Sequence, residues 1–336
     1  MNTETMDHQP VKLPARILGK TGFAVSEVGF GAWAIGGSWG EEVDETTALD
    51  ALHAAVDAGV NFIDTADVYG GGRSEQLIGK LLKARSERIF VATKMGRGSG
   101  WTDSYEAVEA AAAKAAQWLG VETLDLVQLH CIPFATLQAG RVFEHLEKIK
   151  EKGLIRFYGA SVETVEEGLF CAQQTECAAL QVIFNIFRQK LIDELFPVTA
   201  AHNVGIIARV PLASGVLTGK FSADHNFAPG DHRAFNANGE AFNVGETFAG
   251  VPFERGVEFA ANIREILGDE APLSRQALRW ILDFPAVSTV IPGAKTPQQA
   301  RDNVAASSLP ALDTDAHARL HQLYENEIAP TIRGAY

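Results

Sequence analysis

Hydrophobic residues follow two alternating patterns along most of the chain. Short runs rich in β-branched and other apolar residues are followed by longer stretches in which apolar residues recur every three or four positions. This alternation predicts strands that alternate with helices. The eight candidate strands are residues 28–30, 61–64, 89–93, 124–129, 156–160, 180–184, 205–208 and 287–291. Strands alternating with helices are typical of a parallel α/β sheet, and eight such units favour a closed (β/α)8 barrel, the TIM barrel, over an open sheet.

Capping residues support the predicted helices. The helical stretches are residues 46–58, 103–119, 137–152 and 313–327. Gly59, Gly120 and Gly153 directly follow the first three, and glycine is the usual left-handed residue after a helix end. Asp103, with Glu106 three residues later, has the spacing of an N-cap pair. We therefore expect helices that end at defined residues between the strands.

Three segments fall outside the strand–helix repeat. Residues 12–23, which contain a Gly-Lys-Thr-Gly turn, predict an N-terminal hairpin on the floor of the barrel, preceded by a disordered tail at 1–11. Residues 221–255 follow the seventh strand, show weak periodicity and are rich in Gly, Asn, Phe and Asp. Long ordered loops of this kind are often functional, so we expect a lid over the active site and cofactor. No interdomain linker is evident, which predicts one domain over 1–336.

Composition narrows the class of protein. The chain of 336 residues has 42 acidic and 29 basic residues and a net charge of −13, which argues against general binding to nucleic acid or anionic membranes. Its three cysteines, Cys131, Cys171 and Cys177, form no Cys-x-x-Cys pair, so we expect no metal site and a reducing compartment. With neither an apolar leader nor a long apolar run, the sequence predicts a cytoplasmic protein, as a monomer or weak homo-oligomer.

Four polar residues at or just after strand ends are the candidate catalytic group: Asp64, Tyr69, Lys94 and His130. The active face of a (β/α)8 barrel lies at the carboxyl ends of its strands, so these side chains can converge. A lysine ammonium lowers the pKa of a nearby phenol, a carboxylate can hold that lysine, and a histidine can orient a carbonyl oxygen. Taken singly, each has a structural alternative as a helix cap, a packing aromatic, a solvated loop lysine or a core histidine.

Motifs around these residues resemble those of the aldo-keto reductase family. The stretch from Asp64 to Gly70, then Ser74-Glu75 and Gly79, is similar to the family signature, as are Lys94 and Leu129-His130 in their positions after strands. The resemblance spans residues 18–303 and includes the channel-β-subunit and inositol-operon branches. It implies that Asp64, Tyr69, Lys94 and His130 form a catalytic tetrad. The implied reaction is hydride transfer from nicotinamide C4 to a small carbonyl compound, with Tyr69 protonating its oxygen.

The expected cofactor site lies in other strand-end loops. The glycines at 29–37 do not have Rossmann spacing, but small residues follow the seventh strand, and a helix begins at Thr296 or Pro297 after the eighth. Lys295 is placed for a 2′-phosphate, which predicts NADPH over NADH. The resemblance adds Ser161 and Gln181 as partners of the nicotinamide carboxamide, and Gln299 and Asn303 near the adenine. The predicted cofactor residues are Ala32, Trp33, Asp64, Ser161, Gln181, Arg209, Val210, Pro211, Leu212, Ala213, Gly215, Lys220, Arg233, Gly293, Lys295, Gln299, Asp302 and Asn303.

The sequence departs from the family pattern at two positions. Val162 stands where many members have Asn after the serine, and Arg209 stands where members commonly stack an aromatic ring on the nicotinamide. A planar guanidinium can also stack. Its charge predicts altered cofactor affinity or a preference for anionic or polyhydroxylated substrates. The candidate substrate-pocket residues, which have ordinary loop packing as their alternative, are Trp33, Trp39, Trp101 and Phe134.

Two other functions compete with a reductase. A non-catalytic NADPH-binding subunit, with a redox-sensing or regulatory role and weak turnover, would resemble the channel β subunits. A Schiff-base aldolase would use Lys94 as its nucleophile, although a neighbouring Asp64 would keep that lysine charged. Cys131, next to His130, has no base partner in the sequence and is interpreted as a packing residue.

Overall fold

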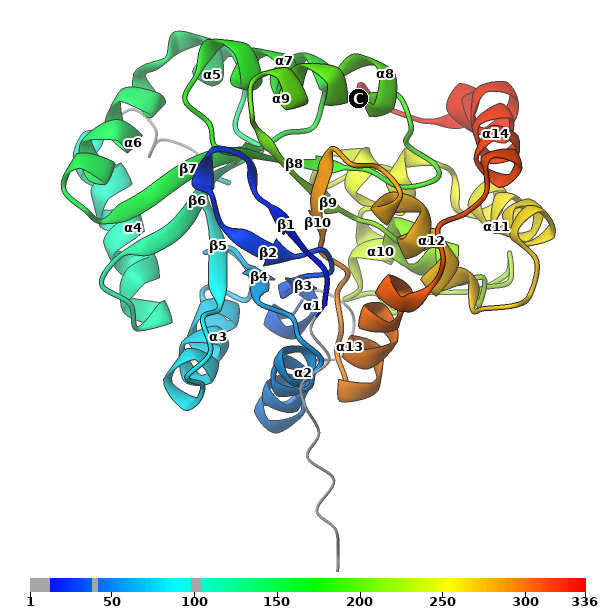
Figure 1. Ribbon diagram of the computed structural model, residues 1–336, viewed down its shortest axis with the longest axis horizontal. Helices are drawn as coiled ribbons and strands as arrows, with labels where there is room; N and C mark the ends of the chain where they lie inside the picture. The colour runs from blue at the N-terminus through cyan, green and yellow to red at the C-terminus, as the bar shows by residue number, and fades with distance from the viewer. Residues whose placement is uncertain (1–12, 38–41, 98–103) are drawn as a thin grey trace, which may run out of the picture.

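Eight parallel strands form a barrel within the residues described by the computed structural model, which are 13–37, 42–97 and 104–336 (Figure 1). They follow one another in chain order as β3 (Phe30–Gly31), β4 (Phe62–Asp64), β5 (Phe90–Met95), β6 (Leu124–His130), β7 (Ile155–Ser161), β8 (Ala179–Ile183), β9 (Gly205–Arg209) and β10 (Val287–Val290). The barrel closes between the first and last of them, where Gly29 N donates to Val290 O at 2.8 Å and Gly31 N donates to Pro292 O at 3.1 Å. The predicted (β/α)8 barrel is confirmed.

Helices surround this barrel (Figure 1). They are α1 (Trp33–Gly36), α2 (Glu45–Asp57), α3 (Arg73–Ala84), α4 (Tyr105–Leu119), α5 (Phe134–Ala139), α6 (Arg141–Glu151), α7 (Val165–Gln174), α8 (Leu191–Glu194), α9 (Phe196–Ala201), α10 (His232–Phe235), α11 (Phe253–Leu267), α12 (Leu273–Leu282), α13 (Pro297–Val304) and α14 (Thr314–Leu323). None of the helices among the described residues is long and apolar enough to cross a membrane.

Two helix predictions need correction. The N-cap of α4 is Ser104, whose hydroxyl accepts from Ala107 N, and not Asp103, which lies outside the described residues. The predicted helix 137–152 is two helices, α5 and α6, because Gly140 between them has a φ of +78° and an α-helix cannot pass through that conformation. The pattern at 137–152 could not show this break, since a lone glycine is tolerated within many helices.

Alternation along the strands divides the barrel interior into an apolar lower layer and a polar upper layer. Side chains two residues apart on a strand point to the same face. Buried apolar residues from several strands form the lower cluster, which includes Phe62, Ala92, Leu126, Ala179 and Ile207. Two residues further along the same strands come Asp64, Lys94, Gln128, Gln181 and Arg209. The same periodicity that fills the floor therefore directs polar side chains toward the carboxyl-terminal face.

An antiparallel hairpin covers the floor of the barrel, as predicted (Figure 1). Its strands are β1 (Ala15–Ile17) and β2 (Ala24–Ser26), with the turn η1 (Gly19–Thr21) between them. The second strand begins one residue beyond the predicted hairpin 12–23, whose first residue is outside the described part. Leu18 and Val25 are fully buried and join the apolar cluster inside the barrel. The hairpin therefore completes the core on the side away from the polar layer.

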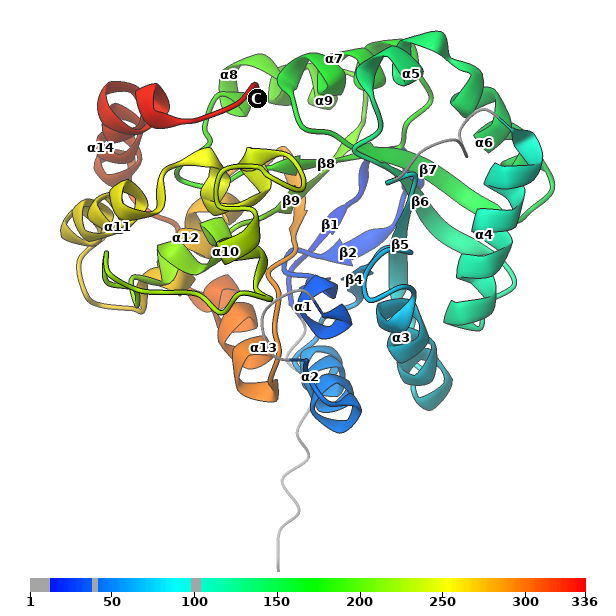
Figure 2. The ribbon, with the colours of Figure 1, turned by 180° about the vertical axis from the view of Figure 1, so that it is seen from behind.

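The segment 221–255 lies on the opposite face of the barrel (Figure 2). It contains α10, the short helices η3 (Val244–Glu246) and η4 (Phe248–Gly250), and the start of α11. Its path is fixed by internal hydrogen bonds. The Asn236 side chain accepts from the backbone N–H groups of Ala241 and Phe242 and donates to Thr247 Oγ1. An asparagine that supplies three hydrogen bonds is a means of ordering a segment that has no periodic pattern of its own.

The hairpin packs so closely against the barrel at Gly205 that this position has no room for a side chain. A Cβ on Gly205 would lie 2.7 Å from Leu18 Cδ1 and 2.8 Å from Gly19 N. We expect Gly205→Ala to lower the free energy of unfolding by about 1–3 kcal/mol, because the hairpin must shift to admit the methyl group. Urea denaturation measures the change. Gly230→Ala is the matched control, since no heavy atom among the described residues outside its chain neighbours lies within 4 Å of its Cβ position. Equal stabilities of the two variants would contradict the expectation.

Candidate active site

Lys94 lies at the centre of the polar layer and is almost completely buried. Its ammonium donates to Asp64 Oδ2 at 2.6 Å, to Thr65 O at 2.9 Å and to the Tyr69 hydroxyl at 3.0 Å. Asp64 ends β4, Lys94 is near the end of β5, and Tyr69 is on the loop between β4 and α3. All three ammonium donors have acceptors, so the predicted contact of Lys94 with Asp64 and Tyr69 is present in the structure.

The charges around Lys94 keep it an ammonium ion. Burial alone would lower the pKa of Lys94, but the carboxylate of Asp64 and the oxygen of Tyr69 outweigh it and raise the pKa above its usual value. A nucleophilic amine for Schiff-base chemistry needs the neutral form of lysine. The geometry at Lys94 therefore opposes the aldolase alternative.

Tyr69 behaves differently from the sequence-based expectation. Burial raises its pKa above 10.0, and Lys94, the second largest influence, lowers the pKa without reversing that shift. The expected net lowering of the Tyr69 pKa by Lys94 is wrong for this arrangement. Burial of the phenol destabilises the phenolate more than one nearby ammonium ion stabilises it. Tyr69 consequently carries its proton at neutral pH, which is the state that a proton donor requires.

The other oxygen of the Asp64 carboxylate accepts from two glutamines. Gln181 Nε2 donates to Asp64 Oδ1 at 2.6 Å and Gln128 Nε2 at 3.1 Å. Gln181 was expected near the nicotinamide carboxamide, and its nitrogen is directed to Asp64. Gln128 was not expected at the site, although it is two residues before His130 on the same strand and so faces the interior. Together these bonds fix Asp64, and Asp64 fixes Lys94.

His130 is paired with an arginine that the sequence did not suggest. Arg97 Nη1 lies 3.2 Å from His130 Nε2. A guanidinium has only donors, so Nε2 accepts in this contact and the proton of a neutral ring is on Nδ1. Burial lowers the pKa of His130 well below 6.5, and the charges of Lys94 and Arg97 lower it further, so the ring is neutral. Arg97 therefore presents a cation where His130 was expected to present a hydrogen-bond donor.

Arg209 lies beside this pair at the end of β9 and is almost fully buried. Its Nη2 donates to Val162 O at 3.2 Å, and its Nη1 lies 3.4 Å from Glu246 Oε1. The same Glu246 oxygen accepts from Arg97 Nη2 at 2.8 Å. Glu246 belongs to η3, within the segment 221–255. The side chain that was expected to face the nicotinamide is thus held by a carboxylate from the segment expected to act as a lid.

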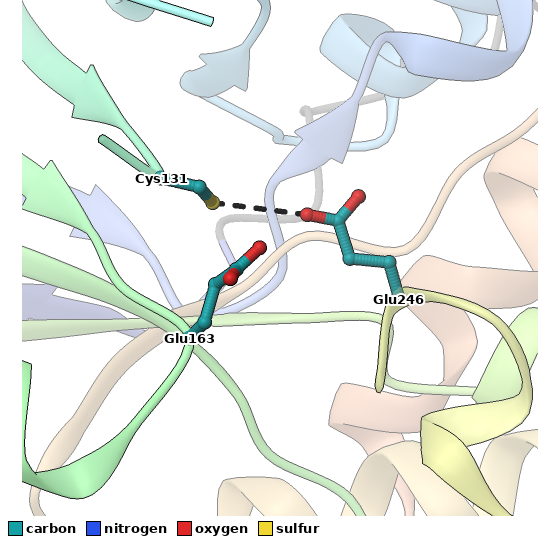
Figure 3. Close-up of side chains that lie close together, drawn as sticks. All are labelled: Cys131, Glu163 and Glu246. Atoms are coloured by element: carbon teal, nitrogen blue, oxygen red, sulfur yellow. Dashed lines mark hydrogen bonds between the residues drawn. The ribbon is translucent and has the colours of Figure 1, made fainter. Parts of the chain in front are cut away.

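Three potential metal ligands meet at this point: Cys131, Glu163 and Glu246 (Figure 3). Their ligand atoms lie within 4.8 Å of one another. The Glu246 carboxylate already forms ion pairs with two guanidiniums, and burial raises the pKa of Cys131 to about 12, so Cys131 remains a thiol. Metal binding needs a deprotonated sulfur and carboxylates free to coordinate. We therefore interpret the group as an ion-pair network.

A cavity of about 550 Å³ opens above the polar layer. Among the predicted site residues, those lining it are Trp33, Asp64, Tyr69, His130, Ser161, Gln181, Arg209, Val210, Pro211, Leu212, Gly215, Lys220, Arg233, Gly293, Lys295, Gln299, Asp302 and Asn303. Lys94 lies beneath the cavity, and Ala32 and Ala213 are buried behind its wall. Lining residues that were not predicted include Arg97, Ser214, Phe235, Phe242, Glu246 and Ser274.

The loop after β9 has an unusual backbone. Val210, Ala213 and Ser214 have φ angles of +53°, +46° and +54°, and Gly215 follows at +98°. Residues other than glycine in this region are strained by roughly 1–3 kcal/mol each and tend to mark functional sites. Arg233 holds the loop from above: it forms an ion pair with Asp231 at 2.6 Å and donates to Ser214 O at 3.4 Å. The result is a fixed, small-residue turn with cationic side chains beside it.

The loop after β10 leads into the N-terminus of α13, as predicted. Thr296 is the N-cap, and its hydroxyl accepts from Gln299 N. The Gln299 side chain accepts from Lys295 N at 2.7 Å, and Asn303 Nδ2 donates to Gly293 O at 3.1 Å. Asp302 instead pairs with Arg275 at 2.5 Å. A helix N-terminus next to lysine favours an anionic group.

Aromatic side chains form the mouth of the cavity. The Trp33 ring is stacked 6.0 Å from Tyr69 and lies 4.7 Å from the His232 ring, both measured between ring centroids. Phe242 lies beneath the Arg97 guanidinium at 5.1 Å. Of the other proposed pocket aromatics, Trp39 and Trp101 are outside the described residues. Phe134 packs against Phe170, away from the cavity lining, so its prediction as a pocket residue is wrong.

Comparison with known proteins places the chain in a family. The model of the Aldo/keto reductase family matches residues 27–325, and the chain belongs to this family of oxidoreductases. It is 30% identical over 328 residues to the NADH-specific methylglyoxal reductase of Escherichia coli, covering 89% of this chain and 95% of that protein. It is also 30% identical to a probable voltage-gated potassium channel subunit beta of rice, over 86% of this chain and 89% of that one.

Solved structures have the same fold. The glycerol dehydrogenase of Gluconobacter oxydans superposes with a TM-score of 0.76 at 27% identity, covering 96% of this chain and 98% of that one. The holo form of an aldo-keto reductase from Bacillus halodurans gives a TM-score of 0.74 at 25% identity, with the same coverage. A Klebsiella pneumoniae aldo-keto reductase, solved in complex with NADPH, gives 0.71 at 21% identity and shows the likeness of fold.

A second acidic group lies behind the polar layer. Glu75 on α3 is fully buried, and one carboxyl oxygen accepts from Thr93 Oγ1 on β5. Its other oxygen has no hydrogen-bond partner among the described residues. Burial, the largest influence, raises the pKa of Glu75 to about 7, with a further contribution from Asp67. The folded protein therefore favours the protonated carboxyl at this position.

This shift predicts a pH-dependent stability. Between the usual pKa of 4.5 and about 7, the unfolded chain loses the Glu75 proton while the folded chain keeps it, so the free energy of unfolding falls as pH rises. The loss is on the order of 3 kcal/mol and is complete above the folded-state pKa. Glu75→Gln, which imitates the protonated acid, should lack this component. Urea denaturation of both proteins near pH 5 and 8 measures it, and parallel pH profiles would contradict the assignment.

Proposed function

We propose that this protein is an NADPH-dependent reductase of small aldehydes or ketones, with Tyr69 as the general acid. The contact that carries the proposal is the 3.0 Å hydrogen bond from the buried Lys94 ammonium to the Tyr69 hydroxyl, next to an open cavity. A phenol that is protonated, faces a cavity and has a cation behind it can release a proton to a carbonyl oxygen. The remaining phenolate then lies against Lys94, which stabilises it. The reverse reaction would use Tyr69 as the base.

The residues along the cavity fit a dinucleotide. Lys220, Arg233 and Lys295 provide positive charge near the loops after β9 and β10, while Ser161 and Gln181 offer polar groups near Tyr69. When bound, reduced nicotinamide supplies the hydride that is added to the carbonyl carbon. Arg209 is buried beside this end and its planar group can lie against a ring. We also propose that the segment 221–255 acts as a lid, because His232, Phe242 and Glu246 contact residues around Tyr69.

The cellular setting follows from the thiols. Cys131, Cys171 and Cys177 are all free in the structure, which fits a reducing compartment. We propose a cytoplasmic enzyme that acts on small molecules as a monomer or weak homo-oligomer. The similarity to a channel β subunit makes a regulatory, NADPH-binding subunit the alternative function. A rigidly held Lys94–Tyr69 pair favours the enzyme, because catalysis requires this pair and cofactor binding alone does not.

Tyr69→Phe tests the catalytic assignment. The variant keeps the ring contacts with Trp33 but removes the transferable proton, so kcat for NADPH-dependent aldehyde reduction should fall by at least about 100-fold. The dissociation constant for NADPH, measured by fluorescence titration, should not change. Tyr105→Phe, on α4 and hydrogen-bonded to Glu109, is the control and should retain full activity. Activity retained by Tyr69→Phe would overturn the mechanism.

Lys295→Ala tests the cofactor preference. Relatives differ in this respect, since the Escherichia coli protein is named as NADH-specific. If Lys295 contacts a 2′-phosphate, its removal should raise the KM for NADPH by about tenfold and leave the KM for NADH unchanged, because only NADPH carries that phosphate. Arg301→Ala removes a positive charge from α13, the helix that follows Lys295, at a position outside the cavity lining, and serves as the control. Equal changes for both cofactors would exclude this role for Lys295.

A further inference from the structure

The substrate end of the cavity contains two arginines that share one carboxylate. Arg97 follows β5 and Arg209 ends β9, and both reach Glu246 Oε1, at 2.8 Å and 3.4 Å. All three residues line the same cavity as Tyr69 and His130. Two converging guanidiniums are a common recognition element for carboxylates and phosphates. Here that element is already occupied by a side chain of the protein.

Glu246 is held in this position by its backbone as well as by its charge. Its N–H donates to Asn243 O at 3.0 Å, and its carbonyl oxygen accepts from Ser214 Oγ at 3.3 Å. Only 5% of its side chain is exposed. Burial alone would raise the pKa of Glu246, but Arg209 and Arg97 together hold the pKa below its usual value, so the group is a carboxylate. An anion that displaced it would leave a buried, unpaired charge behind, which is costly.

We propose that Glu246 sets the charge selectivity of the substrate site. Its carboxylate fills the anion site that Arg97 and Arg209 would otherwise form, so uncharged, hydroxylated carbonyl compounds are accepted and carboxylate-bearing ones are disfavoured. This inference rests on the proposed reductase function. Of the two substrate classes that Arg209 suggested beside an altered cofactor affinity, anionic and polyhydroxylated, it favours the polyhydroxylated class.

The remaining groups around Arg209 agree with an uncharged ligand. Glu163 adds a second carboxyl near Arg209 and accepts from Asn243 Nδ2 at 3.0 Å. The Cys131 thiol lies 3.6 Å from Arg209 Nη2 and 3.7 Å from Glu246 Oε1. A substrate hydroxyl can donate to a carboxylate and accept from a guanidinium, so it uses both kinds of group in this cluster. A substrate carboxylate can use only the guanidiniums and is repelled by Glu246.

A matched pair of substrates isolates the effect of charge. Succinate semialdehyde and its primary amide have nearly the same shape and the same reacting carbonyl group, but only the former is an anion. For the wild-type protein with NADPH we expect a higher kcat/KM for the amide. In Glu246→Gln the ratio of kcat/KM for the anion to kcat/KM for the amide should rise by about 10- to 100-fold, because two guanidiniums are released to bind a carboxylate.

Two further variants make the result specific. Glu163→Gln removes a neighbouring carboxyl that does not bridge the two arginines, and it should change the ratio much less. Arg97→Gln added to Glu246→Gln should abolish most of the gain. If Glu246→Gln does not fold, Glu246→Asp, which withdraws the carboxylate by one methylene, should shift the ratio in the same direction. A ratio unchanged from wild type in the folded Glu246 variant would overturn the proposal.

A binding measurement separates this inference from the proposed function. Acetate titrated into the protein with NADP⁺, followed by calorimetry, should bind Glu246→Gln more tightly than wild type, and acetamide should not. Failure of the wild type to reduce any carbonyl compound, with Tyr69→Phe as reference, would refute the reductase assignment alone. Identical acetate binding by wild type and Glu246→Gln would refute the role of Glu246, whatever the turnover.

Discussion

The buried ion pair between Lys94 and Asp64 is the constraint on which the site depends. An ammonium ion in the interior of a barrel is stable only if its donors are all satisfied, and here a carboxylate, a backbone carbonyl and a phenol satisfy them. Those three partners come from the end of β4 and the loop that follows it. The requirement to satisfy one charge therefore positions Tyr69, and the two glutamines on Asp64 extend the same network across the barrel to β6 and β8.

Much of this arrangement could be predicted from the sequence, because strands in a parallel barrel have a simple rule. The carboxyl ends of all the strands lie on one face of the barrel, so polar residues at those ends lie close together. Asp64, Lys94 and His130 could therefore be identified without a structure. Gln128 was not predicted, although the same two-residue periodicity places it inside the barrel, because it lies within an apolar strand and not at its end. The pKa of Tyr69 could not be predicted, because it depends on how much water reaches the phenol and not on the residues present.

The site residues that the sequence did not predict are held by contacts between loops that are distant along the chain. Arg97 is two residues beyond the end of its strand, and Glu246 belongs to a segment without periodicity, 149 positions later in the chain. No local pattern relates them. The break at Gly140 was missed for a related reason: whether a glycine is tolerated in a helix or ends it is decided by its surroundings. The sequence shows Arg209 as a departure from the family pattern but does not show its ion-pair partner, Glu246, which neutralises the charge of Arg209.

The seam of the barrel has a consequence for how the protein is made. β3 and β10 meet where Gly31 lies so close to Ile291 O that a Cβ would be 2.6 Å from it, and Gly31, Ile291 and Gly293 all line the cavity. The first and last strands thus build one wall of the site together. A nascent chain cannot form that wall until residues near 293 have been synthesised. A ligand bound in this cavity would therefore stabilise only the completed barrel, in which the two ends of the sheet are joined.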